Sequence, residues 1–168
     1  AGWGALAKSF KGFRAPYLST GPGLDAALKE ASFAFDASGV SRGPEAPVRV
    51  GSHTEFALPM IPEGPKGRRI IAMDYNMFVR HSGGMERAGD AGTFTERTYE
   101  AFAAAFEAEY NADRTPLQMG FHFTLMNGGA YWDALERFAR DHCVKADVRC
   151  VSYEGWLKEH GAGETARG

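Results

Sequence analysis

Three polar residues stand at the ends of segments that the sequence predicts to be strands: Arg14, Asp74 and His122. An arginine supplies a fixed positive charge that can orient a carboxylate. A histidine beside a carboxylate is held in one tautomer and can act as a general acid near neutral pH. Because the ends of parallel strands meet at one face, where active sites of α/β proteins collect, the pattern predicts acid–base chemistry there.

Each of these residues also has an ordinary structural interpretation. Arg14 could be a surface arginine beside a turn, and Asp74 could cap a turn at the end of its strand. His122 could be a core histidine that bonds a backbone carbonyl. The occurrence of all three residues at strand ends favours the functional interpretation.

The residues after Arg14 form a stiffened corner. Pro16 fixes its own φ angle and biases Ala15 toward an extended conformation. The backbone N–H of Tyr17 is therefore expected to be held in place and able to point at a ligand.

Hydrophobic spacing predicts the elements that position these residues. Strands are expected over residues 10–14, 33–35, 56–58, 69–74, 117–123 and 148–151. Helices are expected over about 22–31, from a capping box of Thr93 and Glu96 to Tyr110, over 131–142, and after a capping Ser152. This alternation predicts an α/β fold, a mostly parallel sheet or barrel with outer helices.

Two segments are expected to be loops. Residues 39–68 contain five of the eight prolines, and residues 80–92 are polar and rich in glycine. Long loops in compact domains are often functional, so either segment could cover a substrate. The polar tail, 161–168, is expected to be frayed, which leaves residues 1–160 as the folded part.

Composition limits the partners. The net charge of −2 gives no reason to expect nucleic acid or an anionic membrane, and no apolar run approaches the roughly 20 residues that span a bilayer. The two cysteines, Cys143 and Cys150, fit either a disulfide in an oxidising compartment or two free thiols.

Three short motifs carry a resemblance to a known family: Arg14-Ala15-Pro16-Tyr17, Met73-Asp74-Tyr75-Asn76 and Gly120-Phe121-His122. Their order and spacing resemble the third, fourth and fifth motifs of polysaccharide deacetylases of the NodB-homology type, carbohydrate esterase family 4. The segment 33–38 resembles the strand that follows the third motif in that family, and the segment 147–153, with the helix before it, resembles the family's closing strand and helix. The resemblance implies that residues 1–160 are the C-terminal portion of a distorted (β/α) barrel.

The same resemblance implies an activity and roles for single residues. Members of the family use a divalent metal, usually zinc, to hydrolyse N-acetyl groups of a polysaccharide. Arg14 would orient the catalytic base, and the Tyr17 backbone N–H would stabilise the oxyanion. His122 would protonate the leaving amine, and Asp74 would orient His122.

The sequence departs from the family in both downstream motifs. The fourth motif usually reads Asp-x-x-Asp-Trp, whereas the second carboxylate is missing after Asp74, so that Asp74 itself or Asn76 would orient the histidine. The fifth motif usually has Asp after the histidine, and here the residue is Phe123. We expect a variant subgroup of the family.

The family's first two motifs, which supply the base and the metal ligands, do not occur. The remaining histidines are scattered without ligand spacing: His53, His81, His142 and His160. We therefore expect no metal ligand in this chain, and a preceding segment of the same polypeptide that supplies the zinc ligands and the base.

Two classes of function are consistent with these motifs. The first is a secreted or cell-envelope deacetylase whose acetylated polysaccharide contacts Pro16, Tyr17 and Tyr75. The alternative is a non-catalytic carbohydrate-binding relative that uses Tyr17, Tyr75 and Trp132 to stack on sugars. A serine hydrolase is disfavoured because no Gly-x-Ser-x-Gly sequence occurs.

Overall fold

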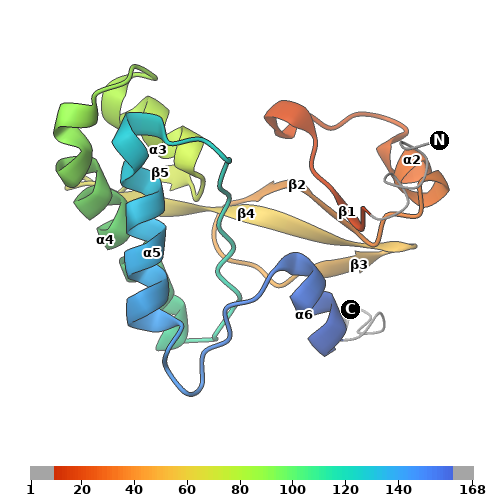
Figure 1. Cartoon of the computed structure of the whole chain (residues 1–168). Coiled ribbons are helices and arrows are strands. Elements are labelled where there is room, and N and C mark those ends of the chain that lie inside the picture. Colours follow the sequence, from red (N-terminus) through yellow and green to blue (C-terminus); the bar gives the residue numbers. More distant parts are fainter. Residues whose placement is uncertain (1–9, 161–168) are drawn as a thin grey trace. The chain divides into compact units, whose positions relative to one another are not determined.

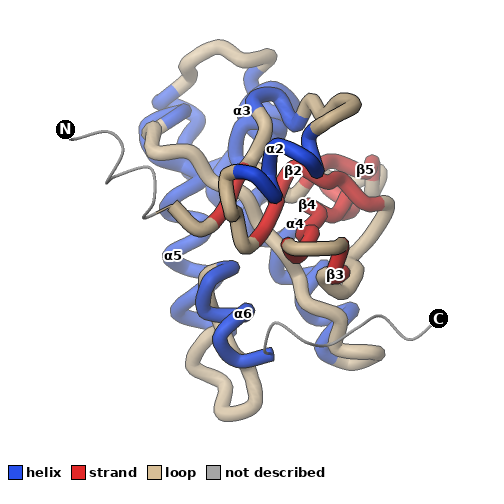
Figure 2. Tube along the Cα trace, turned by 90° about the vertical axis from the view of Figure 1, so that its right-hand side faces the viewer, coloured by secondary structure: helices blue, strands red, loops and turns tan. Residues whose placement is uncertain are grey.

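A computed structural model describes residues 10–160; the tail predicted to be frayed, 161–168, lies outside the described residues (Figure 1). The strands are β1 (Gly12–Phe13), β2 (Phe35–Ser41), β3 (Val48–Val50), β4 (His53–Glu63) and β5 (Arg68–Ile71). The helices are α2 (Leu24–Glu30), α3 (Asp74–Ser82), α4 (Ala91–Tyr110), α5 (Ala130–His142) and α6 (Tyr153–His160), with short 3-10 turns at Pro16–Leu18, Ala88–Asp90 and Met126–Gly129. Helices are blue and strands are red in Figure 2, and along the chain the described strands all precede α3.

The strands form a mixed sheet, which confirms the predicted α/β class. Their order is β1-β2-β4-β3, and β5 pairs with β4. β1 and β2 are parallel, as predicted, whereas β4 is antiparallel to both β3 and β5. The antiparallel pairs follow from short turns, which can join antiparallel strands but not parallel ones.

The described chain divides into two compact units. Unit 1 contains residues 10–40, 46–57 and 151–160, and unit 2 contains residues 41–45 and 58–150. The strand β4 contributes its first part to unit 1 and its second part to unit 2.

Aromatic side chains form the core of unit 1. Phe56 of β4 is buried, and its ring centroid lies 4.4 Å from that of Tyr153 and 5.7 Å from that of Phe35. Trp156 contacts Phe56 edge-on, so α6 packs on the start of β4. The Ser152 hydroxyl accepts a hydrogen bond from the Gly155 N–H at 3.1 Å, which confirms the predicted helix cap.

Helices α4 and α5 pack side by side in unit 2 (Figure 1). The predicted aromatic stripe of α4 is part of the core, because Phe102 is fully buried and Tyr99 and Phe106 pack against the same cluster. Tyr131 and Phe138 of α5 complete this contact. Apolar residues at helical spacing therefore predicted both helices and the faces that they bury.

Cys143 and Cys150 form a disulfide within unit 2. The alternative of two free thiols is therefore wrong. None of the helices in the described part of the chain is both long enough and apolar enough to cross a membrane.

The segment 39–68 is not the long loop that its prolines predicted. It contains the end of β2, all of β3 and all of β4. Pro59 and Pro62 lie inside β4, and the Pro59 carbonyl accepts a hydrogen bond from the Ala72 N–H at 2.9 Å. Proline removes a donor but not an acceptor, so a strand can tolerate it where no donor is needed.

Several predicted boundaries are also wrong. β2 begins at Phe35 and continues to Ser41, so residues 36–38 belong to the strand rather than to the turn after it. Asp74 opens α3 instead of ending a strand, and α3 was not predicted. Helix α4 begins at Ala91 and has no side-chain cap, so Thr93 and Glu96 form no capping box.

Two predicted strands are not formed. Residues 117–123 make a single parallel bridge, between Gly120 and Met73, and residues 148–151 are irregular. Leu117, Met119 and Phe121 nevertheless pack against the core of unit 2. A segment can therefore pack alternate side chains against the core without forming the hydrogen-bonded ladder of a strand.

Candidate functional site

Asp74 and His122 are in direct contact within unit 2. Asp74 is fully buried at the start of α3. Its Oδ1 lies 2.7 Å from Nδ1 of His122, and its Oδ2 accepts the His122 backbone N–H at 2.7 Å. One carboxylate therefore holds both the ring and the backbone of the histidine.

The single bridge between Met73 and Gly120 explains this contact. The Gly120 N–H donates to the Ala72 carbonyl at 2.9 Å, and the Asp74 N–H donates to the Gly120 carbonyl at 3.1 Å. The bridge is parallel, so Asp74 and His122 both follow it closely along their segments, and the His122 N–H reaches the Asp74 carboxylate. The predicted juxtaposition is present, although neither residue ends a regular strand.

The contacts of Asp74 orient the imidazole ring of His122. The Tyr75 N–H also donates to Oδ1, at 2.7 Å, so the carboxylate accepts three hydrogen bonds. An ionised carboxylate can only accept, which assigns a hydrogen to Nδ1 of His122. The His122 side chain is 52% exposed, and its other ring nitrogen, Nε2, is the one left for chemistry.

Three aromatic residues surround the histidine. The Trp132 indole N–H donates to the His122 carbonyl at 3.0 Å, and the Tyr75 ring lies edge-on to the imidazole at 6.1 Å. Phe123 is fully exposed and stacks on Trp132 with ring centroids 6.3 Å apart. Tyr75 is half exposed as well, so apolar ring surface adjoins an accessible histidine.

In unit 1 the Arg14 guanidinium is held on two sides. Its Nε donates to the Ala37 carbonyl and its Nη2 to the Tyr153 hydroxyl, each at 2.9 Å. Burial raises the pKa of Tyr153, and the positive charge of Arg14 opposes that rise. This contact could not be predicted from the sequence, because the two residues are far apart in the chain and share no pattern.

Two buried residues of β2 fix the corner after Arg14. The Ala15 N–H donates to the Ser38 hydroxyl at 2.8 Å. The Ser38 hydroxyl and N–H in turn donate to Oδ1 of Asp36. The position of the corner is thus set by hydrogen bonds from the neighbouring parallel strand.

Tyr17 adopts a left-handed backbone conformation, with φ 57° and ψ 16°, which is uncommon for a residue with a side chain. The N–H groups of Leu18 and Ser19 donate to Ala15 and Pro16, whereas that of Tyr17 has no acceptor among residues 10–160. Pro16 and Tyr17 are exposed. The Tyr17 N–H therefore makes no hydrogen bond within residues 10–160, and its role in binding a ligand stays a prediction.

The residues predicted for the site thus fall into two groups. Arg14, Pro16 and Tyr17 belong to unit 1, and the residues 74–75 and 122 belong to unit 2. Within each unit they are close together and held by hydrogen bonds.

The residues around His122 do not form a metal site of the family type. Among the described residues, one group of three side chains has metal-ligating atoms close together, and it consists of Asp25, His53 and Glu55 in unit 1. This group was not predicted, because Asp25 lies far from His53 and Glu55 in the sequence and the three residues form no recognisable motif. The Asp74–His122 pair lacks a third ligand.

Comparison of the chain with protein-family models, with curated proteins and with solved structures finds no match. The resemblance to polysaccharide deacetylases therefore stays a hypothesis carried by the three motifs. The geometry of the Asp74–His122 pair and of the corner at Tyr17 is the physical basis for assigning a function.

Proposed function

We propose that this chain is part of a hydrolase that removes N-acetyl groups from a polysaccharide, with His122 as the general acid. The observation that supports this best is the contact between buried Asp74 and half-exposed His122. A histidine fixed through one nitrogen and accessible at the other can deliver a proton in a defined direction.

The proposed step is the breakage of the C–N bond of the acetamido group. The leaving nitrogen needs a proton as this bond breaks, because an amide anion is a poor leaving group. Nε2 of His122 delivers the proton, and Asp74 keeps the ring oriented and stabilises its positive charge. Asp74 is thus a positioning residue.

The corner of unit 1, considered by itself, supplies a donor suited to a negatively charged oxygen. The free N–H of Tyr17 can stabilise an oxyanion because it is already held in place. The left-handed conformation of Tyr17 costs roughly 1–3 kcal/mol, and such strain is concentrated at functional sites. We propose that Arg14 orients the catalytic base.

We further propose that zinc and the catalytic base are held by a segment outside this chain, which would also complete a distorted (β/α) barrel. The residues around His122 do not fit a metal, so no step through a metal is assigned to them. We place the protein in the secreted or cell-envelope compartment, because the disulfide is typical of oxidising environments.

The test is the His122→Ala variant in the complete protein, assayed on N-acetylated oligosaccharides. We expect kcat to fall by about 10²–10⁴-fold, the usual contribution of general acid–base catalysis, with substrate affinity nearly unchanged. His160→Ala, which changes an exposed histidine of α6, is the matched control and should keep full activity. Equal losses in affinity and kcat, or no loss, would argue against the acid role.

A second candidate function is carbohydrate binding without catalysis. The exposed rings of Tyr75 and Phe123 favour it, because flat apolar faces stack on sugars. A complete protein that binds N-acetylated oligosaccharides but releases no acetate would support this candidate over the deacetylase.

A further inference from the structure

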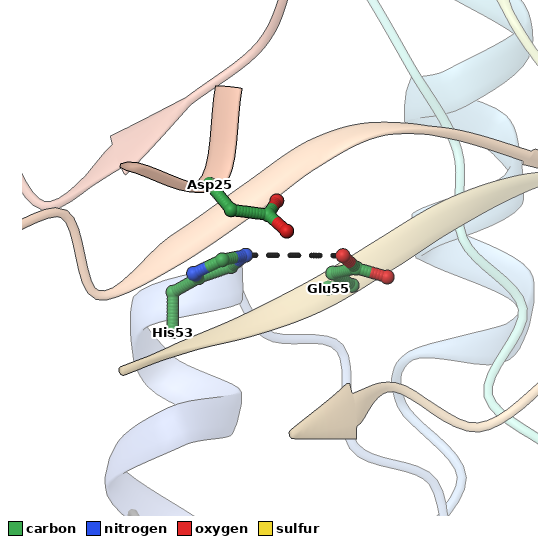
Figure 3. Close-up of side chains that lie close together, drawn as sticks. All are labelled: Asp25, His53 and Glu55. Carbon is green, nitrogen blue, oxygen red and sulfur yellow. Dashed lines mark ion pairs between the residues drawn. The ribbon is translucent and has the colours of Figure 1, made fainter. Parts of the chain in front are cut away.

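We propose that Asp25, His53 and Glu55 form a binding site for a divalent transition-metal ion in unit 1. Asp25 lies in the first turn of α2, and His53 and Glu55 lie at the start of β4 (Figure 3). One ligating atom from each residue lies within 4.8 Å of the other two. This site is independent of the proposed deacetylase function and of any metal held outside the chain.

His53 is the strongest indication of a ligand. The residue is only 2% exposed, and neither ring nitrogen has a hydrogen-bond partner among the described residues. Buried polar side chains almost always have a partner, so an unpaired imidazole calls for an explanation. Its Nε2 points toward Glu55 at 3.8 Å, which is beyond hydrogen-bond distance.

Only a small movement of these side chains is needed for all three to bind one ion. Residues two apart on a strand point to the same face, so His53 and Glu55 reach the same point, and Asp25 approaches from α2 (Figure 3). Donors bound to one zinc ion lie about 3.3 Å apart, given bonds of about 2.0–2.2 Å. Both carboxylates are exposed and can rotate toward the ion, whereas the His53 side chain is buried and held in place.

The donor set favours a particular class of ion. Two carboxylates and a neutral imidazole carry a charge of −2, which balances a divalent cation. The imidazole nitrogen favours Zn²⁺ and its first-row neighbours over Mg²⁺ and Ca²⁺, which prefer oxygen ligands alone. Three protein ligands leave a fourth position for water or another group.

The other buried histidines do not offer such a site. His142 also lacks hydrogen-bond partners, but the Lys145 ammonium lies 3.3 Å from Glu107, the carboxylate nearest to that ring. His81 contacts Glu63, which is already paired with two arginines. Positive charge repels a cation at both places, whereas neither Asp25 nor Glu55 forms an ion pair with a lysine or arginine among the described residues.

Metal bound at this site would join α2 to β4. The ion would stabilise unit 1 by an amount that rises with the logarithm of its concentration relative to its dissociation constant, because it binds the folded chain and requires three side chains brought together by folding. Addition of Zn²⁺ should therefore raise the thermal unfolding temperature.

The test is a calorimetric titration of the metal-free chain with Zn²⁺, compared with Asp25→Asn and Glu55→Gln. Both carboxylates are exposed, so these variants should fold normally. We expect each to lose at least about tenfold in affinity, because even outer-shell partners of metal ligands contribute roughly 10–100-fold. Glu30→Gln, at an exposed position of the same helix, is the control and should bind like the wild type.

A second measurement locates the ion directly. Nitrogen NMR of the histidine side chains should show a large Zn²⁺-dependent shift at His53, which Mg²⁺ does not produce. His122→Ala should bind Zn²⁺ like the wild type, which separates this site from the proposed active site. The inference is overturned if the wild type shows no saturable binding, if both carboxylate variants bind like the wild type, or if the His53 signal does not move.

Discussion

Unit 2 contains two pairs in which a buried carboxylate contacts a histidine. The two pairs differ in ways that suit one to catalysis and the other to a structural role. Asp74 contacts His122 at 2.7 Å, and Glu63 contacts His81 at 3.1 Å. Both carboxylates are buried, but the His122 side chain is 52% exposed whereas that of His81 is fully buried. A close carboxylate alone therefore does not make a histidine available for catalysis.

The neighbours of the two carboxylates differ as well. Asp74 is otherwise bonded by backbone N–H groups, whereas Glu63 also binds Arg97 and Arg80. Burial alone would raise the pKa of Glu63, but hydrogen bonds from Arg97 and His81 outweigh it, and the pKa is lowered. Burial, followed by the positive charge of Arg97, lowers the pKa of His81.

The Glu63 cluster is accordingly a structural network. It connects β4, through Glu63, with α3 and α4, which carry Arg80, His81 and Arg97. Its histidine has a pKa lowered by burial, and its side chain is fully buried. The contrast between the pairs can be tested by changing each carboxylate.

The largest expected effect is on catalysis at the Asp74 pair. Asp74→Asn should lower kcat by about 10²–10⁴-fold, because an amide no longer fixes the ring or stabilises its charge. Substrate affinity should stay unchanged, and Asp74→Glu should keep part of the kcat that Asp74→Asn loses. A parallel loss of affinity and rate would show that Asp74 only supports the fold.

The next effect is on stability at the Glu63 pair. Glu63→Gln should lower the free energy of unfolding by about 3 kcal/mol, the low end for breaking a buried pair, because the two arginines are partly exposed. Glu96→Gln, which removes an exposed partner of Arg137, should change it by less than about 1 kcal/mol in the same denaturant titration. Similar losses of unfolding free energy in both variants would show that the buried pair and the surface pair stabilise the fold equally.

A smaller effect concerns pH. His81 and His142 both have pKa values lowered by burial from the ordinary 6.5, so the folded chain binds fewer protons than the unfolded chain just below that pH. Stability should be complete above pH 6.5 and fall as the pH drops toward the folded-state pKa values. Glu63, whose pKa is also lowered, adds a further loss below pH 4.5. His81→Asn should flatten the upper part of this curve in denaturant titrations; an unchanged curve would contradict the assignment.

The smallest effect concerns the aromatic surface beside His122. Phe123→Ala should leave stability nearly unchanged, because the side chain is fully exposed. It should weaken oligosaccharide binding by about 0.5–1.5 kcal/mol, the value of a stacked aromatic contact. Val144→Ala, another exposed apolar position of unit 2, should have no effect on binding. Equal binding by both variants would argue against sugar stacking at Phe123.

The parts of the fold that the sequence predicted are those with a local pattern. Helices α4 and α5 follow from apolar residues at helical spacing, and the cap at Ser152 follows from its position before α6. The helix α3 was missed because its first residue was assigned to the preceding strand and residues 80–82 to a glycine-rich loop. Only residues 56–58 of β4 were predicted as a strand, because the prolines of this segment resemble loop residues.

In the candidate site, too, some contacts could be predicted from the sequence and others could not. Asp74 and His122 were predicted together, although the reason was a single bridge rather than two strand ends. The contact between Arg14 and Tyr153 depends on how distant segments pack, and so does the grouping of Asp25 with His53. No spacing in one sequence carries that information.

The central claim is that His122 delivers a proton to a poor leaving group. It is tested most directly by comparing two substrates in the complete protein: an N-acetylated oligosaccharide and p-nitrophenyl acetate, whose leaving group needs no proton. We predict that His122→Ala lowers amide hydrolysis by about 10²-fold or more while ester hydrolysis stays within about threefold. Equal losses on both substrates would contradict the assignment of His122 as the general acid.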